Sequence, residues 1–212
     1  MNKYVVEFIG TFFLVFTIGN VVIAPGAGNL APLAIGGVLM VMIFAGGHIS
    51  GAHYNPAVTL AVFLRGKCDA KDVGPYLGAQ ILASIIAGGS VLFLKGPEAV
   101  AKIAAMDLSA KLPQAILAEF LFTFALAFVV LNVATAKGTE GNSFYGLAIG
   151  FTVMVGAFAV GGISGGVFNP AVAVGISVMG LSSWANIWVY LVANLAGGAL
   201  AAGVYKFVNK SD

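Results

Sequence analysis

The stretch that decides the fold is HISGAHYNPAVT, residues 48–59, and its tripeptide Asn55-Pro56-Ala57 returns as Asn169-Pro170-Ala171 in the second half of the chain. Each copy follows Ile-Ser-Gly at the same distance, at 49–51 and at 163–165. Asn is a favoured N-cap residue, and Pro is favoured in the first turn of a helix. Each copy therefore predicts a helix start. Two such starts that face each other inside a membrane would make a solute site out of backbone dipoles.

Composition places the chain in a membrane. Of the 212 residues, 60% are hydrophobic and only 8% are charged, whereas a soluble domain carries about 25% charge. The net charge of +2, with no basic cluster, indicates no nucleic-acid partner. The single cysteine, Cys68, lies in a polar stretch and cannot form an internal disulfide, so we interpret it as a free thiol in a loop.

Six long apolar runs are each near the roughly 17–25 residues that span a bilayer. They cover Tyr4–Ala24, Leu30–Gly47, Pro75–Leu94, Pro113–Ala136, Phe144–Val160 and Trp184–Val208. The shorter apolar pieces Pro56–Leu64 and Pro170–Gly180 follow the two tripeptides and are too short to cross. The sequence predicts an all-α membrane protein with six transmembrane helices and two re-entrant half-helices.

The two halves are an internal repeat. The segment 7–12, EFIGTF, resembles 119–124, EFLFTF, and an Asn-Pro-Ala box follows in each half. Each half holds three spans, which is an odd number, so the halves must enter the membrane in opposite directions. We therefore predict one transmembrane channel domain over 1–212, built from inverted repeats at about 1–94 and 113–208.

Loop charge predicts the orientation. Seven of the ten Lys and Arg residues lie at the two chain ends and in the 65–74 and 137–142 loops. The other three, Lys95, Lys102 and Lys111, share one loop on the other face. The positive-inside rule then puts both termini in the cytoplasm, with the protein in the plasma or inner membrane of a cell.

Three spans per half place both half-helix N-termini at the midplane, each with about half a positive charge. The backbone before each box must then be non-helical at membrane depth, which is tolerated where its carbonyls line water. Asn55 and Asn169 supply amide donors at the centre. This pattern satisfies a neutral hydrogen-bonding solute and opposes a cation. The residues expected to present carbonyls to the pore are Gly51, Ala52, His53, Tyr54, Gly165, Val167 and Phe168.

The stretch 48–59, together with the repeat, resembles the aquaporin and aquaglyceroporin family of major intrinsic proteins, over essentially all 212 residues. The resemblance implies a homotetramer in which each subunit has its own pore and conducts passively. In most of that family an Arg directly follows the second box and forms one side of the outer selectivity filter. Here that position is Val172, and the next, often Asp in glycerol channels, is Ala173.

Distances from the boxes carry the other filter positions of the family over to Ile35, Ala157 and Gly166. With Val172 this set is small and wholly apolar in its side chains. It predicts a filter wider than a water filter, with no fixed cation. The expected solutes are water with some of ammonia, hydrogen peroxide, glycerol, urea or dissolved gas.

Three further residues, Glu7, Glu119 and His48, are expected to have structural roles. Glu7 and Glu119 are ionisable groups inside spans, which by default suggest an ion site. Their equivalent places in the repeat favour instead that each accepts hydrogen bonds from the re-entrant backbone of its own half. His48 either braces its loop or gates the pore mouth.

No catalytic triad, metal cluster or phosphate loop is recognisable, so we expect no enzyme activity, no cofactor and no metal. Two other functions stay open. A secondary transporter would need a coupling-ion site, for which only Glu7 and Glu119 supply charge. A closed, junction-like structural protein would have a dewetted apolar constriction at Ile35, Val172 and Phe168.

Overall fold

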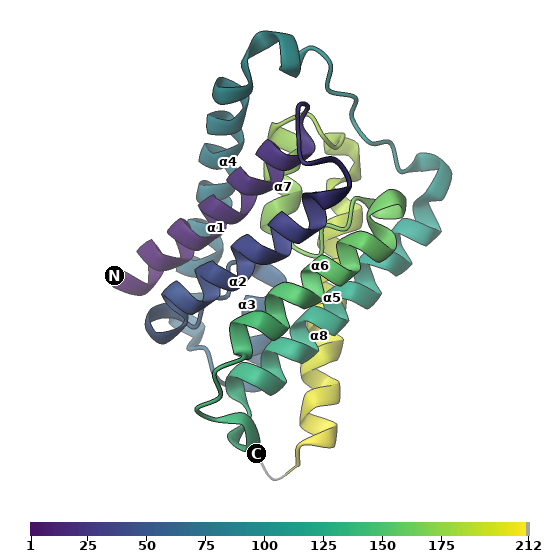
Figure 1. Ribbon diagram of the computed structural model, residues 1–212. Coiled ribbons are helices and arrows are strands. Elements are labelled where there is room, and N and C mark those ends of the chain that lie inside the picture. Colours follow the sequence, from purple (N-terminus) through teal and green to yellow (C-terminus); the bar gives the residue numbers. More distant parts are fainter. Residues whose placement is uncertain (211–212) are drawn as a thin grey trace.

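The computed structural model describes residues 1–210, which form eight α-helices joined by short turns (Figure 1). In chain order the helices are α1 Asn2–Val22, α2 Ala31–Ser50, α3 Pro56–Arg65, α4 Ala70–Val100, α5 Leu112–Thr135, α6 Tyr145–Ser164, α7 Pro170–Val178 and α8 Ile187–Val208. Within the described range, the order long, long, short, long occurs twice. The first four helices and the last four are therefore two copies of one arrangement.

Six of these helices are long and apolar enough to cross a membrane. The other two, α3 with 10 residues and α7 with 9, are the half-helices. At 1.5 Å per residue each reaches only about half of the roughly 30 Å hydrocarbon core. The predicted fold class is confirmed, and the protein is a multi-pass membrane protein.

Helix ends differ most from the apolar runs at α4 and α6. The fourth helix begins at Ala70 instead of Pro75 and continues to Val100, with a break at Gly96. Helix α6 extends beyond Val160 to Ser164. The reason is that apolar runs mark depth in the bilayer, whereas helix ends are set by caps and hydrogen bonds.

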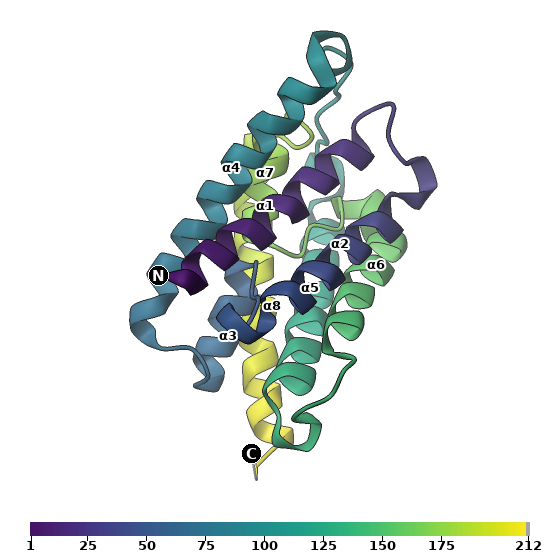
Figure 2. The same ribbon diagram turned by 60° about the vertical axis from the view of Figure 1, so that its left-hand side comes forward.

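The long helices pack in pairs. Helix α1 lies along α4, α5 along α8, and α2 of the first half along α6 of the second (Figures 1 and 2). The α2–α6 crossing is close because Gly36 and Gly150 meet there. A Cβ on Gly36 would lie 2.6 Å from the Gly150 carbonyl oxygen. Small residues at such crossings are how membrane helices approach one another.

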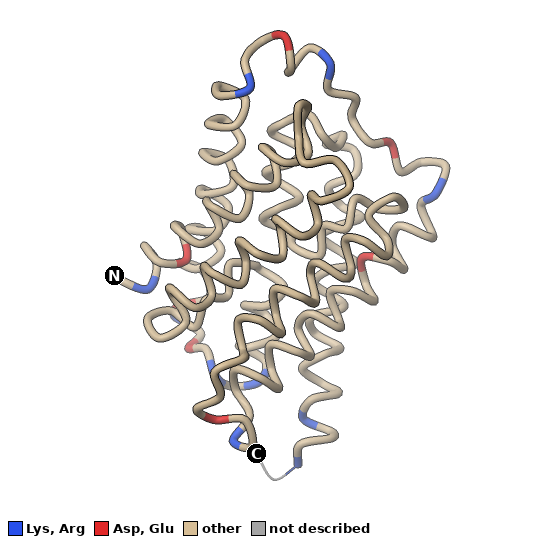
Figure 3. The backbone as a smooth tube through the Cα atoms, in the orientation of Figure 1, with Lys and Arg blue, Asp and Glu red and all other residues tan. Residues whose placement is uncertain are grey.

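Charged residues gather at the two ends of the bundle, with few between them (Figure 3). We call one end the terminal end; it holds residues 1–3 and the 66–69 and 136–144 loops. The other, the opposite end, holds the 23–30, 101–111 and 179–186 segments. Many large apolar side chains between the ends are exposed on the bundle's outside. Such a surface suits a lipid environment.

Candidate functional site

Both half-helices start at the paired boxes. Asn55 is the N-cap of α3, and its Oδ1 accepts a hydrogen bond from the Ala57 N–H at 2.8 Å. Asn169 is the N-cap of α7, and its Oδ1 accepts from the Ala171 N–H at 2.9 Å. Each proline follows its cap as the first helical residue, where a missing N–H costs nothing. The helix starts predicted from the tripeptides are present.

The two caps also join the halves. The Asn55 Nδ2 donates to the Phe168 carbonyl oxygen at 2.8 Å, and the Asn169 Nδ2 donates to the Tyr54 carbonyl oxygen at 2.8 Å. An amide nitrogen has two hydrogens, so each Asn keeps one for another acceptor. The half-helix N-termini therefore meet tip to tip, and two donors remain at the meeting point.

The segments before the caps have an unusual backbone that is the same in both halves. Residues 51, 52 and 54 have φ of 82°, 50° and 49°, and residues 165, 166 and 168 have 94°, 62° and 49°. A non-glycine residue in this left-handed region costs about 1–2 kcal/mol. The pattern prevents helical hydrogen bonding. Within residues 1–210, the carbonyl oxygens of 51–53 and 165–167 accept no hydrogen bond, so they are free for a solute.

A buried glutamate holds each segment. Glu7 accepts hydrogen bonds from the His53 N–H at 2.9 Å and the Tyr54 N–H at 2.7 Å. Glu119 accepts from the Val167 N–H at 2.9 Å and the Phe168 N–H at 2.7 Å. Because these backbone donors bind a carboxylate behind the loop, they do not face the cavity, and the free carbonyls dominate the loop's polar surface.

One cavity of about 380 Å³ contains both Asn caps and all four residues carried over as filter positions. Its lining includes Ile35 from α2, Ala157 from α6, Gly166 from the second re-entrant loop and Val172 from α7. The cavity reaches residues of the 101–111 and 179–186 segments, so it opens toward the opposite end. The structure thus brings together residues that lie far apart in the sequence.

A second cavity, of about 630 Å³, lies on the terminal side and is lined by residues of the 136–144 loop, Lys67 and His48. Both cavities have Ile43, His53, Val130 and Ile149 in their walls, which places a junction there. The His48 side chain is exposed and makes no hydrogen bond within residues 1–210, so no contact of that kind braces the loop. Together the cavities trace a route along the bundle.

The ring of His53 at this junction is hydrogen-bonded through its Nδ1 to the Thr59 hydroxyl at 3.1 Å. The same hydroxyl lies 3.0 Å from the Asn55 carbonyl oxygen and accepts from the Gln80 Nε2 at 3.1 Å. When its one hydrogen is donated to that carbonyl, the hydroxyl accepts from Nδ1. In this arrangement the neutral ring carries its proton on Nδ1, and Nε2 is a hydrogen-bond acceptor.

Arg65 is the chain's single arginine, and it does not line the 380 Å³ cavity. It sits in the last turn of α3, where its guanidinium donates to the Tyr205 hydroxyl and lies 4.8 Å from that ring's centroid. The side chain at the position after the second box, Val172, is buried and apolar. Its neighbour Phe168 packs its ring against Phe122 instead of toward the cavity centre.

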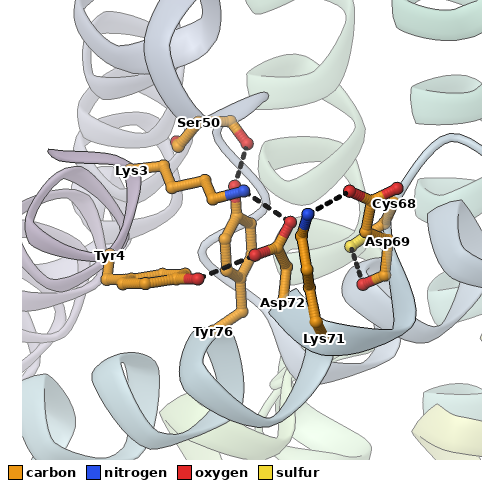
Figure 4. A network of polar contacts seen from close by, with 8 residues as sticks. All are labelled: Lys3, Tyr4, Ser50, Cys68, Asp69, Lys71, Asp72 and Tyr76. Atoms are coloured by element: carbon orange, nitrogen blue, oxygen red, sulfur yellow. Dashed lines mark hydrogen bonds and ion pairs between the residues drawn. The ribbon is translucent and has the colours of Figure 1, made fainter. Parts of the chain in front are cut away.

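A polar network at the terminal end positions the first re-entrant loop (Figure 4). Asp72 of α4 accepts from Lys3 and from the Tyr4 hydroxyl of α1. One turn further on, the Tyr76 hydroxyl donates to the Ser50 carbonyl oxygen at 2.7 Å, where the loop begins. Cys68 lies beside this network as a free thiol, and burial raises its pKa.

Several cavity residues were missed from the sequence, above all Met106, Ser182 and Tyr190. For Ser182 and Tyr190 the internal repeat offered a signal. They lie 114 positions after Cys68 and Tyr76, and Tyr190 repeats the contact of Tyr76 by donating to the Ser164 carbonyl oxygen at 2.9 Å. For Met106, in the segment between α4 and α5, the pattern offered no signal.

Known proteins are similar to this chain in sequence and in fold. The profile of the Major intrinsic protein family matches residues 1–205. A putative aquaporin, NIP4-1, of Arabidopsis thaliana is 36% identical over 220 residues, covering 100% of this chain and 76% of that protein. Glycerol uptake facilitator protein-like 6 of Lactiplantibacillus plantarum is 36% identical over 226 residues, covering 100% of both. The X-ray structure of the aquaglyceroporin from Plasmodium falciparum superposes with a TM-score of 0.79 at 23% identity, covering 97% of this chain and 95% of that one.

Proposed function

The chain belongs to the major intrinsic protein family, a family of channels for water or small solutes, and on that premise we propose that it is a passive pore for small neutral solutes, wider than a water-only channel. The proposed solutes are water together with glycerol, urea, ammonia or hydrogen peroxide. As a member of this family it is a channel and not an enzyme.

The observation that carries the proposal is the wall of the 380 Å³ cavity. It combines a row of free carbonyl acceptors and two Asn donors with mostly apolar side chains, among which His53, Ser182 and Tyr190 are polar. Such a wall can accept hydrogen bonds from the O–H or N–H groups of a solute and can contact the solute's apolar face at the same time. A cation meets two half-helix N-termini, whose dipoles are positive.

The proposed selectivity filter is Ile35, Ala157, Gly166 and Val172. Glycine and alanine supply two of its four sides, and neither reaches far into the cavity. The chain's single arginine, Arg65, lies at the end of α3, where it donates to the Tyr205 hydroxyl. The proposed filter therefore has no arginine to donate hydrogen bonds or to narrow the passage. These features support a wide apolar filter.

We also propose a homotetramer, as the family resemblance implies, with the terminal end in the cytoplasm of the cell. The orientation is supported by loop charge, because seven of ten basic residues lie at that end. The membrane would be the plasma or inner membrane.

The test is stopped-flow light scattering on proteoliposomes, with sucrose as the impermeant osmolyte and glycerol as the permeant one. We expect fast shrinkage in sucrose and fast reswelling in glycerol. In Val172→Arg the glycerol rate should fall at least tenfold, because a long cationic side chain enters the filter. Val172→Leu is the matched control, since it adds bulk without charge and should slow glycerol less.

The same traces separate the rival functions. Fast shrinkage without reswelling would mean a water channel narrowed by another residue. Rates no better than those of empty liposomes would overturn the open pore and favour a closed structural protein, with the apolar junction at Ile43, Val130 and Ile149 as its block. Flux that saturates and follows an ion gradient would favour a secondary transporter.

A further inference from the structure

The segment 101–111, which joins α4 to α5, runs over the opposite end of the bundle (Figure 1). It is held at several points. Met106 pairs with Ser182 in a short bridge, in which the Met106 N–H donates to the Leu181 carbonyl oxygen at 2.9 Å. Leu108 is almost fully buried in the apolar core. The segment is therefore fixed to the mouth of the pore.

A side chain of the 179–186 segment also holds this bridge. Asn186 is buried, and its Nδ2 donates to the Met106 carbonyl oxygen at 2.8 Å and to the Ser182 Oγ at 3.2 Å. Both contacts have good length for neutral hydrogen bonds. Asn186 thus links the α4–α5 segment to the segment that leads into α8.

The thioether of Met106 lies over the second re-entrant loop. A Cβ placed on Gly165 would be 3.7 Å from the Met106 Sδ, 3.5 Å from a Val167 methyl and 3.7 Å from the Tyr190 hydroxyl. Gly165, Val167, Tyr190 and Met106 all line the 380 Å³ cavity. The sulfur therefore sits one residue away from Gly166, the loop's member of the proposed filter.

We propose that Met106 is a fifth, specificity-determining residue of the pore, and that its side chain sets the width open to polyols at the opposite-end mouth. An unbranched thioether with three rotatable bonds fills irregular space and adapts to a passing solute. It presents no charge and only a weak acceptor. Small solutes pass beside it, whereas solutes with longer carbon chains need it to move. This inference rests on the proposed solute pore.

The experiment compares glycerol with the four-carbon polyol erythritol in proteoliposomes. Met106→Ala removes three non-hydrogen atoms from the wall and should raise the erythritol-to-glycerol permeability ratio at least threefold, with water flux within twofold of wild type. Met106→Leu keeps the bulk and should leave the ratio unchanged. Lys102→Ala, an exposed change in the same segment, is the matched control. An unchanged ratio in Met106→Ala overturns the proposal.

Asn186 is a positioning residue in this account. Asn186→Leu should shift the ratio in the same direction as Met106→Ala but by less, because the bond to Leu181 remains. A loss of stability without any change in the ratio would show that Asn186 acts on the fold alone, and would count against its part in positioning.

A thiol placed at this site gives an independent measurement. Cys68 is the chain's single cysteine, so Met106→Cys in a Cys68→Ser background has one reactive thiol. Labelling with a small methanethiosulfonate reagent should reduce water flux at least fivefold. Complete labelling by mass with unchanged flux overturns the proposal. If unlabelled wild type itself conducts nothing, the proposed function has failed, which is a different outcome from a conducting pore that ignores Met106.

Discussion

The two re-entrant loops, 51–55 and 165–169, have the same backbone and different side chains. Both show left-handed residues at the same three places, a buried glutamate behind them and an Asn cap that reaches the other loop. Yet His53 in the first loop stands where the second has Val167. The comparison teaches that the scaffold of the pore is duplicated, whereas the side chains that the two loops contribute to its wall differ.

The support behind the loops differs as well. Gln80 donates to Glu7 at 2.8 Å and to Thr59 at 3.1 Å. Its counterpart Asn194 is one carbon shorter and accepts from the Thr123 hydroxyl at 3.1 Å, while its Nδ2 has no hydrogen-bond partner within residues 1–210. The first loop is therefore held by more hydrogen bonds than the second.

The largest loss of stability should come from replacing the buried glutamates that accept hydrogen bonds behind the loops. The two carboxylate oxygens of Glu7 accept from four donors, two at each oxygen. In Glu7→Gln an amide NH₂ replaces one of these oxygens, so buried donors lose their partner at a cost of about 2–4 kcal/mol. Glu119→Gln faces three donors and should cost less. The measurement is the thermal unfolding midpoint in detergent, with the exposed Glu98→Gln as control. Equal midpoints for the Glu7 and Glu119 variants would contradict the difference between the loops.

A smaller change in stability should come from substituting residues that have a left-handed backbone, Gly166 and Ala52. A Cβ on Gly166 would lie 3.2 Å from the Ala157 Cα, so Gly166→Ala must push α6 and should cost about 1–2 kcal/mol. It should also slow glycerol reswelling by narrowing the cavity. Ala52→Gly, at the equivalent place in the first loop, relieves a left-handed alanine and should change stability by less than about 1 kcal/mol. Equal changes in stability and in glycerol reswelling for the two variants would contradict the expected difference between the two loops at these positions.

The smallest effect should come from making the first half like the second at Thr59, whose counterpart is Ala173. Thr59→Val keeps the shape but removes the hydroxyl that is hydrogen-bonded to the His53 Nδ1, and should cost about 1 kcal/mol. Nitrogen-15 NMR of the His53 ring would report the change, because its proton is no longer held on Nδ1. A ring signal identical to wild type would show that another group fixes the tautomer.

The fold was predicted well from the sequence because its determinants are local. Hydropathy over about 20 residues identifies a span, and Asn-Pro-Ala identifies a half-helix start through the cap of Asn55 and the fixed φ of Pro56. The ends of α4 and α6 were wrong by several residues, because contacts such as Asp72 with Lys3 extend a helix beyond its apolar run.

The candidate site was predicted in part. The repeat led to the paired caps, and the family resemblance led to the positions of Ile35, Ala157, Gly166 and Val172. The structure brings these residues to one cavity. Met106 was out of reach, because it joins the cavity through a bridge to Ser182, 76 positions later in the chain. The hydrogen bond between the His53 ring and Thr59 was also out of reach, because it depends on how the loop folds back on α3.

By itself, then, the sequence determined that this chain spans a membrane six times, that two half-helices start at its Asn-Pro-Ala boxes and that its one arginine is Arg65. Each of these depends on neighbouring residues or on a repeat. Only the tertiary structure decided that each Asn cap binds the other half's loop, that the carbonyls before the caps are left free and that Met106 reaches the pore mouth. The physical reason is that hydrogen bonds and packing between distant segments carry no local sequence pattern.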